Sequence, residues 1–319
     1  MGKANLSLNT ILTRKEVFAD FMNGTLYGGQ QVLKAEDLER IPTHSGIFYE
    51  TEEGKKNALE RQGDVRMKAD LGTYSVILAS EPQNKVHYAM PVRGMLYDAL
   101  EYTKQVQELE NQHKKKGEKL EGSQFLSGIT REDRLTPVVT TVLYAGPDWD
   151  GAKSLYEMME TGEDRSMEEL RKFLPDYKLN LIDVNKIEDT HVFKSCLQHI
   201  FSMAKLRKDK KGLYKYMEDH REALERFDSV ERNAALMLLG EQKRMARYLN
   251  KMEEKGEDRT MSEEFRDVFE ESWFEGQLEG ENRMAELVRL LLADKRQEDL
   301  ERASTDSHYR LQMFEAYGI

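Results

Sequence analysis

The sequence has little cysteine, little proline and no long apolar run. Its 319 residues contain one cysteine and six prolines. A single cysteine cannot form an internal disulfide, and the apolar helical pattern FKSCLQHIF around Cys196 predicts a packed side chain rather than a nucleophile. No window approaches the roughly 18 apolar residues of a membrane span, and the opening MGKANLSLNT lacks a secretory pattern. We therefore expect a cytoplasmic protein with no membrane partner.

An excess of basic residues is also missing. The chain has 59 Asp and Glu against 48 Lys and Arg, which gives a net charge of -11. A protein that coats nucleic acid by electrostatics needs clustered Lys and Arg, so any such contact is expected to be local. The densest basic segment, KLRKDKKGLYK at 205–215, is more typical of a solvated helix end than of a phosphate contact.

The residues that are present can form a sizeable core, since 39% are hydrophobic and 9% aromatic. Strand and helix patterns are mixed up to about residue 225, which predicts an α/β domain with a mixed sheet flanked by helices. Beyond it we find amphipathic helical patterns alone. We predict a first domain over 1–225 and a C-terminal all-helical extension over 226–319, whose helices could form a homodimer contact.

Periodicity and turn residues mark the expected elements. Thr13 and Glu16 fit a capping box that begins the first helix. The stretch 35–41 predicts a short helix, and 51–63 predicts a charged loop. The remaining patterns predict strands at 64–68, 74–81, 135–146 and 177–185, and helices at 90–107, from 149 onward and at 189–206.

The first two strands flank the turn residues ADLGT, which predicts an antiparallel hairpin. A turn centred between positions 72 and 73 pairs residues whose numbers sum to 145, and it sets Asp64 opposite Glu81. Cross-strand partners have Cβ atoms about 5 Å apart, so the two carboxylates could share one cation. Gln83 then lies on the same face as Glu81, because side chains alternate along a strand.

Two acids across a hairpin, with a third on a nearby helix, suit a hard divalent cation such as Mg²⁺. Such a metal polarises a phosphoryl oxygen and lowers the pKa of a bound water, so phosphodiester hydrolysis is the natural reaction. The plainer alternative is that neither acid binds a metal: Asp64 is then the residue at which a strand begins, and Glu81 lies at a solvated strand end. Spacing alone favours that alternative.

Several blocks of the sequence resemble a known family. They are RQGDVRMK, YSVILASEPQNKVHYAMPVRGMLYDALEYTKQ, LTPVVTTVLYAGPDWDG, the N-terminal VFADFMNGTLYGGQQVLKAEDL and the tail EGQLEGENRMAELVRLLL. Together they resemble the recombination-promoting nuclease (Rpn) family, a branch of the PD-(D/E)xK nuclease superfamily that is also described as transposases. The resemblance covers most of the chain.

The resemblance implies a restriction-endonuclease-like fold in which Asp64 and Glu81 hold Mg²⁺ or Mn²⁺. It implies that Gln83 takes the place that lysine fills in much of the superfamily, and that Asp20 or Glu16 on the first helix completes the acidic cluster. The implied activity is metal-dependent DNA endonuclease cleavage, linked in the family to recombination.

Gln83 is neutral, so it can orient a water or a phosphate but cannot act as a general base. Lys85 or Arg66 could supply the missing positive charge. Arg93 and Tyr97 belong to the family-like block MPVRGMLYDALEY and lie one helical turn apart. There Arg93 could contact a DNA phosphate, or it could form a structural salt bridge.

Pro82 removes a backbone donor, which predicts an edge, a bulge or a strand end at this point. It also motivates a second hypothesis from another class, a catalytically silent interaction protein that keeps the nuclease fold. A third, a transposase that joins strands as well as cutting them, follows from the family label alone.

Overall fold

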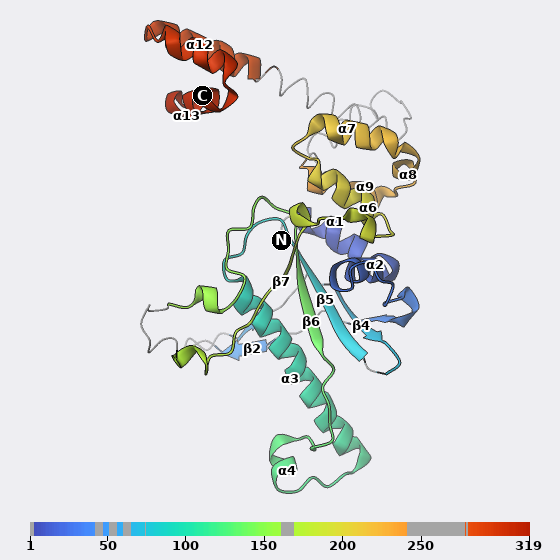
Figure 1. Ribbon diagram of the computed structural model, residues 1–319. Coiled ribbons are helices and arrows are strands. Elements are labelled where there is room, and N and C mark those ends of the chain that lie inside the picture. Colours follow the sequence, from blue (N-terminus) through green and yellow to red (C-terminus); the bar gives the residue numbers. More distant parts are fainter. Residues whose placement is uncertain are drawn as a thin grey trace. The chain divides into compact units, whose positions relative to one another are not determined.

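The computed structural model describes residues 3–41, 47–50, 56–59, 65–73, 75–160, 169–240, 278 and 280–319 (Figure 1). Contacts divide the chain into two compact units. One comprises residues 1–207 and 226–242, and the other comprises residues 208–225 and 243–319. Among the described residues, no helix is long and apolar enough to cross a membrane.

The first unit contains a mixed sheet, as the sequence predicts. Its strand order is β1 (Leu38–Arg40), β4 (Val65–Asp70), β5 (Ser75–Gln83), β6 (Val138–Tyr144), β7 (Asn180–Asp183). Strands β1, β4 and β5 pair antiparallel, whereas β5, β6 and β7 pair parallel. The predicted α/β fold class is therefore confirmed.

Helices cover both sides of this sheet. In the described part of the first unit the named helices are α1 (Lys3–Leu12), α2 (Lys15–Leu26), α3 (Met90–Lys116), α4 (Ser123–Ser127), α6 (Leu197–Lys205) and α9 (Ser229–Leu239), and residues 169–171 are helical as well. In Figure 1, α3 runs along one side of the sheet, and α1 and α2 lie on the other. Helix α9 packs against α1 and α6. The predicted division of the chain at residue 225 stays a prediction.

The β4–β5 hairpin has the predicted register. Val65 pairs with Ser80 and Asp70 pairs with Ser75, so paired numbers sum to 145. Gly72 has a φ of 78°, a conformation that suits glycine, and its N–H donates to Asp70 Oδ1 at 3.0 Å. Asp64, the next position before β4, lies outside the described residues.

Pro82 is the second-last residue of β5, at the strand end that the sequence predicts. Ile77 N–H donates to Pro137 O, and Ala145 N–H donates to Gln83 O, so the odd-numbered residues of β5 bond toward β6. Because in-plane backbone groups alternate along a strand, the missing donor of Pro82 faces the β4 side. The ladder between β5 and β6 accordingly continues to the pair Gln83 and Tyr144.

Five local expectations need correction. Thr13 does not cap α2: the N-cap is Arg14, and Thr13 Oγ1 donates to Thr10 O because α1 ends directly before it. The stretch 35–41 forms a 3₁₀ turn, η1 (Ala35–Asp37), followed by β1. The expected charged loop contains β3 (Lys56–Leu59), paired with β2 (Ile47–Glu50). The helix expected from 149 is a 3₁₀ turn, η2 (Tyr156–Met158), and in the stretch 189–206 η4 (Thr190–Val192) precedes α6.

In the described part of the second unit the regular structure is helical. It contains α7 (Lys210–Asp219), α8 (Arg221–Glu225), α12 (Gln297–Thr305) and α13 (Ser307–Tyr317), and residues 280–293 are helical as well. Leu287, Leu291, Ala303 and Phe314 form a small buried cluster. The predicted helical character of the C-terminal part agrees with these elements.

Charged and polar pairs join α3 to the sheet. Arg66 Nη1 on β4 lies 3.2 Å from Glu101 Oε2 on α3, and each side chain is only 4% exposed. Thr140 Oγ1 on β6 donates to Asp98 Oδ1 on α3 at 2.6 Å. Because a buried charge without a partner is costly, these pairs fix how the helix lies on the strands.

Arg66→Met should lower the free energy of unfolding by about 3–5 kcal/mol, because it leaves the Glu101 carboxylate buried without its cation. Urea unfolding followed by circular dichroism measures the loss. The double variant Arg66→Met with Glu101→Leu should recover most of it. A double variant no more stable than the single one would refute this account of the pair.

Candidate functional site

Glu81 on β5 is the most deeply buried acid among the described residues, with an exposed fraction of 2%. Its Oε1 lies 2.9 Å from Arg93 Nη2, and it accepts a 2.9 Å hydrogen bond from Gln83 Nε2. The predicted common face of Glu81 and Gln83 is thus present. We call Glu81, Gln83, Arg93 and Tyr97 the Glu81 cluster.

Arg93 is held from two directions. Its Nε donates to Tyr97 Oη at 2.9 Å, and the guanidinium carbon lies 5.6 Å from the tyrosine ring centre. Both residues belong to the start of α3, which begins at Met90 with Pro91 in its first turn, a position where proline is favoured. Of the two interpretations of Arg93 left open by the sequence, the salt bridge is the one present in this structure. Its side chain is 30% exposed, so it also reaches solvent.

A row of polar groups continues from Gln83 along the strand ends. Gln83 pairs with Tyr144, and Tyr144 pairs with Asp183, so the three lie side by side at the carboxyl ends of the parallel strands. Asp183 Oδ1 accepts hydrogen bonds from the backbone N–H and the side-chain amide of Asn185. Ligands of parallel sheets commonly bind at such strand ends.

The Tyr144 hydroxyl is fully buried and has no hydrogen-bond partner among the described residues. Burial, followed by the charge of Asp183, raises the pKa of Tyr144. Sequence reasoning did not single out Tyr144 or Asp183 as site residues. The available signal was their position, since both fall near the ends of predicted strands.

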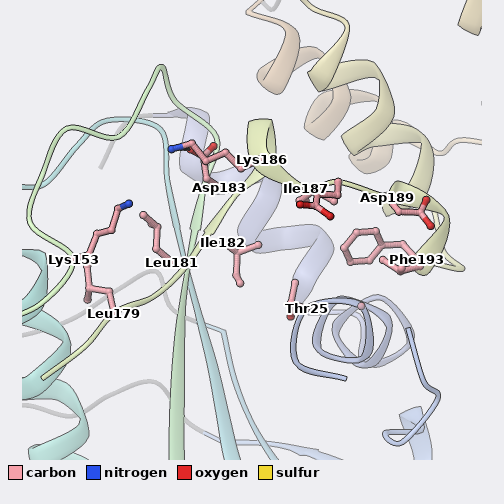
Figure 2. A pocket seen from close by; sticks show the side chains of 13 residues that line it. Thr25, Lys153, Leu179, Leu181, Ile182, Asp183, Lys186, Ile187, Asp189 and Phe193 are labelled. Carbon is pink, nitrogen blue, oxygen red and sulfur yellow. Dashed lines mark ion pairs between the residues drawn. The ribbon is translucent and has the colours of Figure 1, made fainter. Parts of the chain in front are cut away.

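A pocket of about 540 Å³ adjoins this row at the edge strand β7 (Figure 2). Apolar side chains such as Leu181 and Phe193 line it, together with the charged Lys153, Asp183 and Lys186. Asp183 Oδ2 lies 3.7 Å from Lys186 Nζ. Asp183 thus belongs both to the row of strand ends and to the pocket wall.

The remaining predicted acids lie apart from the Glu81 cluster or outside the described residues. Asp64 is one of the latter. Asp20 is buried, and its two oxygens accept hydrogen bonds from Lys194 N, Ser195 N and Ser195 Oγ. This contact ties α2 to the segment before α6. Glu16 is exposed on α2. The assisting role of Asp20 or Glu16 stays a prediction.

The predicted phosphate contacts differ in accessibility. Lys85 is exposed just after β5, in keeping with such a role. Arg66 is buried against Glu101, which argues against a phosphate contact by this arginine. Burial raises the pKa of the Cys196 thiol to about 12, so it stays protonated at neutral pH and is a poor nucleophile.

The described residues do not contain a complete metal site. Among them, no group of three His, Cys, Asp or Glu side chains is placed to hold a metal ion. Glu81 contributes one buried carboxylate, and Gln83 contributes an amide beside it. These oxygens suit a hard divalent cation, and a further carboxylate would have to come from elsewhere.

A mixed sheet flanked by helices agrees with a PD-(D/E)xK nuclease-like protein, and the buried Glu81 and half-buried Gln83 lie at the end of its central strand. Residues 7–235 match the family described as "Putative transposase, YhgA-like", and the chain belongs to this family. The family is part of the PD-(D/E)xK nuclease and Rpn-like group, as the sequence blocks predicted. Searches of curated proteins and of solved structures gave no match. Family membership indicates a nuclease or transposition-related role.

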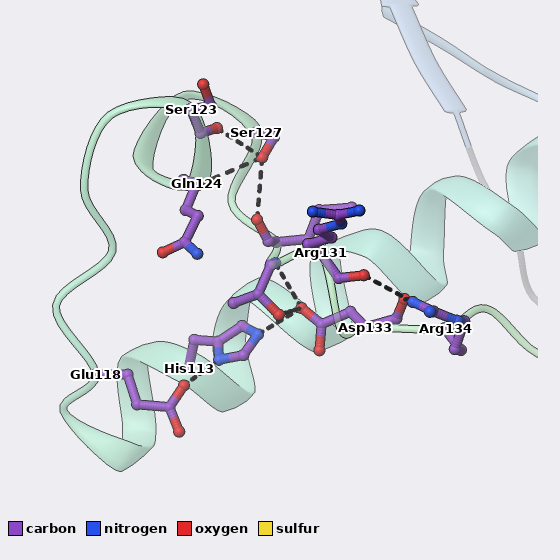
Figure 3. Close-up of polar contacts among 10 residues, drawn as sticks. His113, Glu118, Ser123, Gln124, Ser127, Arg131, Asp133 and Arg134 are labelled. Atoms are coloured by element: carbon purple, nitrogen blue, oxygen red, sulfur yellow. Dashed lines mark hydrogen bonds and ion pairs between the residues drawn. The ribbon is translucent and has the colours of Figure 1, made fainter.

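A second polar cluster lies at the far end of α3 (Figure 3). His113 Nε2 lies 2.7 Å from Asp133 Oδ2, and His113 Nδ1 contacts Glu118. Asp133 also accepts hydrogen bonds from Thr130 N–H and Thr130 Oγ1. Both ring nitrogens can donate only when the imidazole is protonated, so this clasp favours the imidazolium form.

The clasp shifts two pKa values. Hydrogen bonds to Asp133 and then Glu118 raise the pKa of His113. The Thr130 backbone N–H and then His113 lower the pKa of Asp133 to about 2. The histidine contribution to stability is present below its unfolded pKa of about 6.5 and is lost as pH rises through its folded pKa. The aspartate contribution is present above about pH 4 and is lost as pH falls toward 2.

Arg93→Met should destabilise the protein by about 3 kcal/mol, the low end of the range for removing one partner of a buried ion pair, because Arg93 is partly exposed. Chemical denaturation measures the change. Arg93→Lys should recover only part of it, since an ammonium cannot reproduce the fork of the guanidinium. Wild-type stability in Arg93→Met would show that Glu81 does not need this cation.

Raising the pH from about 6 to about 9 should lower the melting temperature of the wild type more than that of His113→Gln, because the variant has no proton to lose. Differential scanning calorimetry at several pH values measures the slopes. His191→Gln, at an exposed histidine outside the clasp, serves as a control for the loss of a histidine at another position. Equal slopes for the wild type and His113→Gln would contradict the proposed clasp.

Proposed function

We propose that this protein is a divalent-metal-dependent DNA endonuclease that hydrolyses phosphodiester bonds. In this proposal Asp64 and Glu81 hold Mg²⁺ or Mn²⁺, and Gln83 positions the attacking water. Family membership supports the nuclease class. The proposed links to recombination and to the cytoplasm rest on the sequence alone, as does a homodimer through the C-terminal helices.

The register of the β4–β5 hairpin is the observation that carries the proposal. The numbers of paired residues sum to 145 throughout the described hairpin. In this proposal the same pairing extends by one residue, so that Asp64, which lies outside the described residues, stands opposite Glu81 as the sequence predicts. Two carboxylates in such positions can bind one hard cation together.

When bound, the metal supplies Lewis-acid polarisation of a phosphoryl oxygen and lowers the pKa of a coordinated water. The chain's own residues supply the rest. Burial at the end of β5 orients the Glu81 carboxylate. The Gln83 amide can both donate to and accept from a water, although it cannot remove its proton.

Arg93 has a distinct part in this proposal. Its guanidinium balances the charge of Glu81, and Tyr97 restrains it. Because the side chain is 30% exposed, a phosphate oxygen can reach it from solvent. Arginine binds phosphate strongly through charge-assisted hydrogen bonds. Arg93 would therefore contact the substrate phosphate while Glu81 turns to the metal.

A silent interaction protein is the second candidate. The observation that favours it is the same ion pair, since Arg93 neutralises the buried Glu81 carboxylate. A scaffold would need nothing further at this position. In the nuclease, by contrast, Glu81 has to exchange this partner for the metal.

Glu81→Gln and Asp64→Ala should each reduce Mg²⁺-dependent nicking of supercoiled plasmid by more than about 100-fold, because each removes a proposed metal ligand. Glu39→Gln is a matched control, since Glu39 is an exposed acid on β1 of the same sheet. Circular dichroism and urea unfolding verify that each variant is folded.

The control variant should nick plasmid at the wild-type rate. Wild-type nicking by folded Glu81→Gln would rule out the proposed metal site. A wild-type protein that cuts neither plasmid nor linear duplex with Mg²⁺ or Mn²⁺ would favour the silent interaction protein.

A further inference from the structure

The segment between α3 and β6 projects beyond the sheet. Helix α3 has 27 residues, which corresponds to about 40 Å at 1.5 Å per residue. Strand β5 has nine residues, or about 30 Å. Since α3 starts near the carboxyl end of β5 and runs back along the sheet, its last turns extend past the strands. Figure 1 shows α4 at that far end.

Two adjacent apolar side chains lie exposed on α4. Phe125 is 77% exposed and Leu126 is 89% exposed, and Leu126 has the largest exposed fraction among the described large apolar residues. Burial of such side chains from water is favourable, so their full exposure at a projecting point indicates a partner surface. We call α4 and its flanking residues 114–134 the α4 tip.

The α4 tip is locally basic in a chain of net charge -11. Its exposed basic residues are Lys114, Lys115, Lys116, Lys119, Arg131 and Arg134. Of the four acids in the same segment, Glu118 and Asp133 are engaged by His113. Lys114 is paired with Glu110. These cations surround the exposed apolar pair Phe125 and Leu126. The α4 tip therefore complements a partner that carries many negative charges and also has apolar surface.

We propose that the α4 tip is a second DNA contact, in which Phe125 and Leu126 insert between base pairs from the minor groove while the flanking Lys and Arg residues bind phosphates. The choice of DNA rests on the proposed function. Apolar wedges of Phe or Leu kink duplexes in this way, and the unstacking cost is offset by the additional protein contact. Phosphate contacts from surrounding cations supply affinity that depends on salt.

The spacing along α3 agrees with a single duplex reaching both sites. Arg93 and His113 are 20 residues apart on one helix, or about 30 Å. One turn of B-DNA is about 34 Å. A duplex whose scissile phosphate lies at the Glu81 cluster would therefore meet the α4 tip about one turn away. The clasp of His113 with Asp133 and Glu118 holds the tip at that distance.

Duplex binding by the full-length protein in EDTA tests the proposal without cleavage. The tip variant is Phe125→Ser with Leu126→Ser. The matched control is Leu170→Ser with Phe173→Ser, another exposed apolar pair of the first unit, 49% and 82% exposed. Fluorescence anisotropy with a 40-base-pair duplex measures affinity, and energy transfer between end labels measures bending.

The tip variant should bind the duplex about tenfold more weakly and should lose the rise in energy transfer, since the inserted apolar side chains are what kink the duplex. The control pair should match the wild type in both readouts. Lys115→Gln with Lys116→Gln and Lys119→Gln should weaken binding and reduce its salt dependence.

Three outcomes would overturn the proposal. The first is duplex binding by the tip variant that equals that of the wild type. The second is that the tip variant and the control variant both prefer single-stranded DNA to the same extent. The third is binding to phosphatidylserine vesicles that depends on the tip, with no binding to duplex DNA. Failure of the endonuclease proposal is separate: tip-dependent duplex binding with no Glu81-dependent cleavage would retain this inference and reject the other. Cleavage that depends on Glu81, together with normal duplex binding by the tip variant, would retain the endonuclease proposal and reject this inference.

Discussion

The buried ion pair of Glu81 and Arg93 is the interaction on which the site depends. An ionised carboxylate with 2% exposure would be costly inside a sheet without a cation beside it. Arg93 supplies that cation from the first turn of α3 at 2.9 Å, and Tyr97 restrains it. The pair thus joins the end of β5 to the start of α3. It also keeps a negative charge buried at the place where parallel strands end.

Local chemistry made part of this structure predictable. The turn at Gly72 specified the hairpin register, and strand periodicity placed Glu81 and Gln83 on one face. Other features depend on residues far apart in sequence. Asp20 bonds to Lys194 and Ser195, a contact that no local pattern encodes. The wrong cap at Thr13 has a local cause instead: α1 ends at Leu12, and the Thr13 hydroxyl donates back to Thr10 O.

Function is distributed along α3 in this account. The start of the helix holds Arg93 against Glu81, its middle is joined to β4 through Glu101, and its end carries the His113 clasp. An acidic protein can still contact DNA when basic residues gather at a projecting tip, because the attraction is local and screened within about 10 Å. Family membership is the reason to expect phosphodiester hydrolysis, and the length of α3 sets the distance between the Glu81 cluster and the α4 tip.

Calorimetric titration with Mn²⁺ tests the central claim most directly, because it measures occupancy of the carboxylates without requiring a DNA substrate. The account predicts saturable binding to the wild type that is lost in both Asp64→Ala and Glu81→Gln and retained in Glu39→Gln. Binding that is unchanged in folded Glu81→Gln, or no binding to the wild type up to millimolar Mn²⁺, would contradict it.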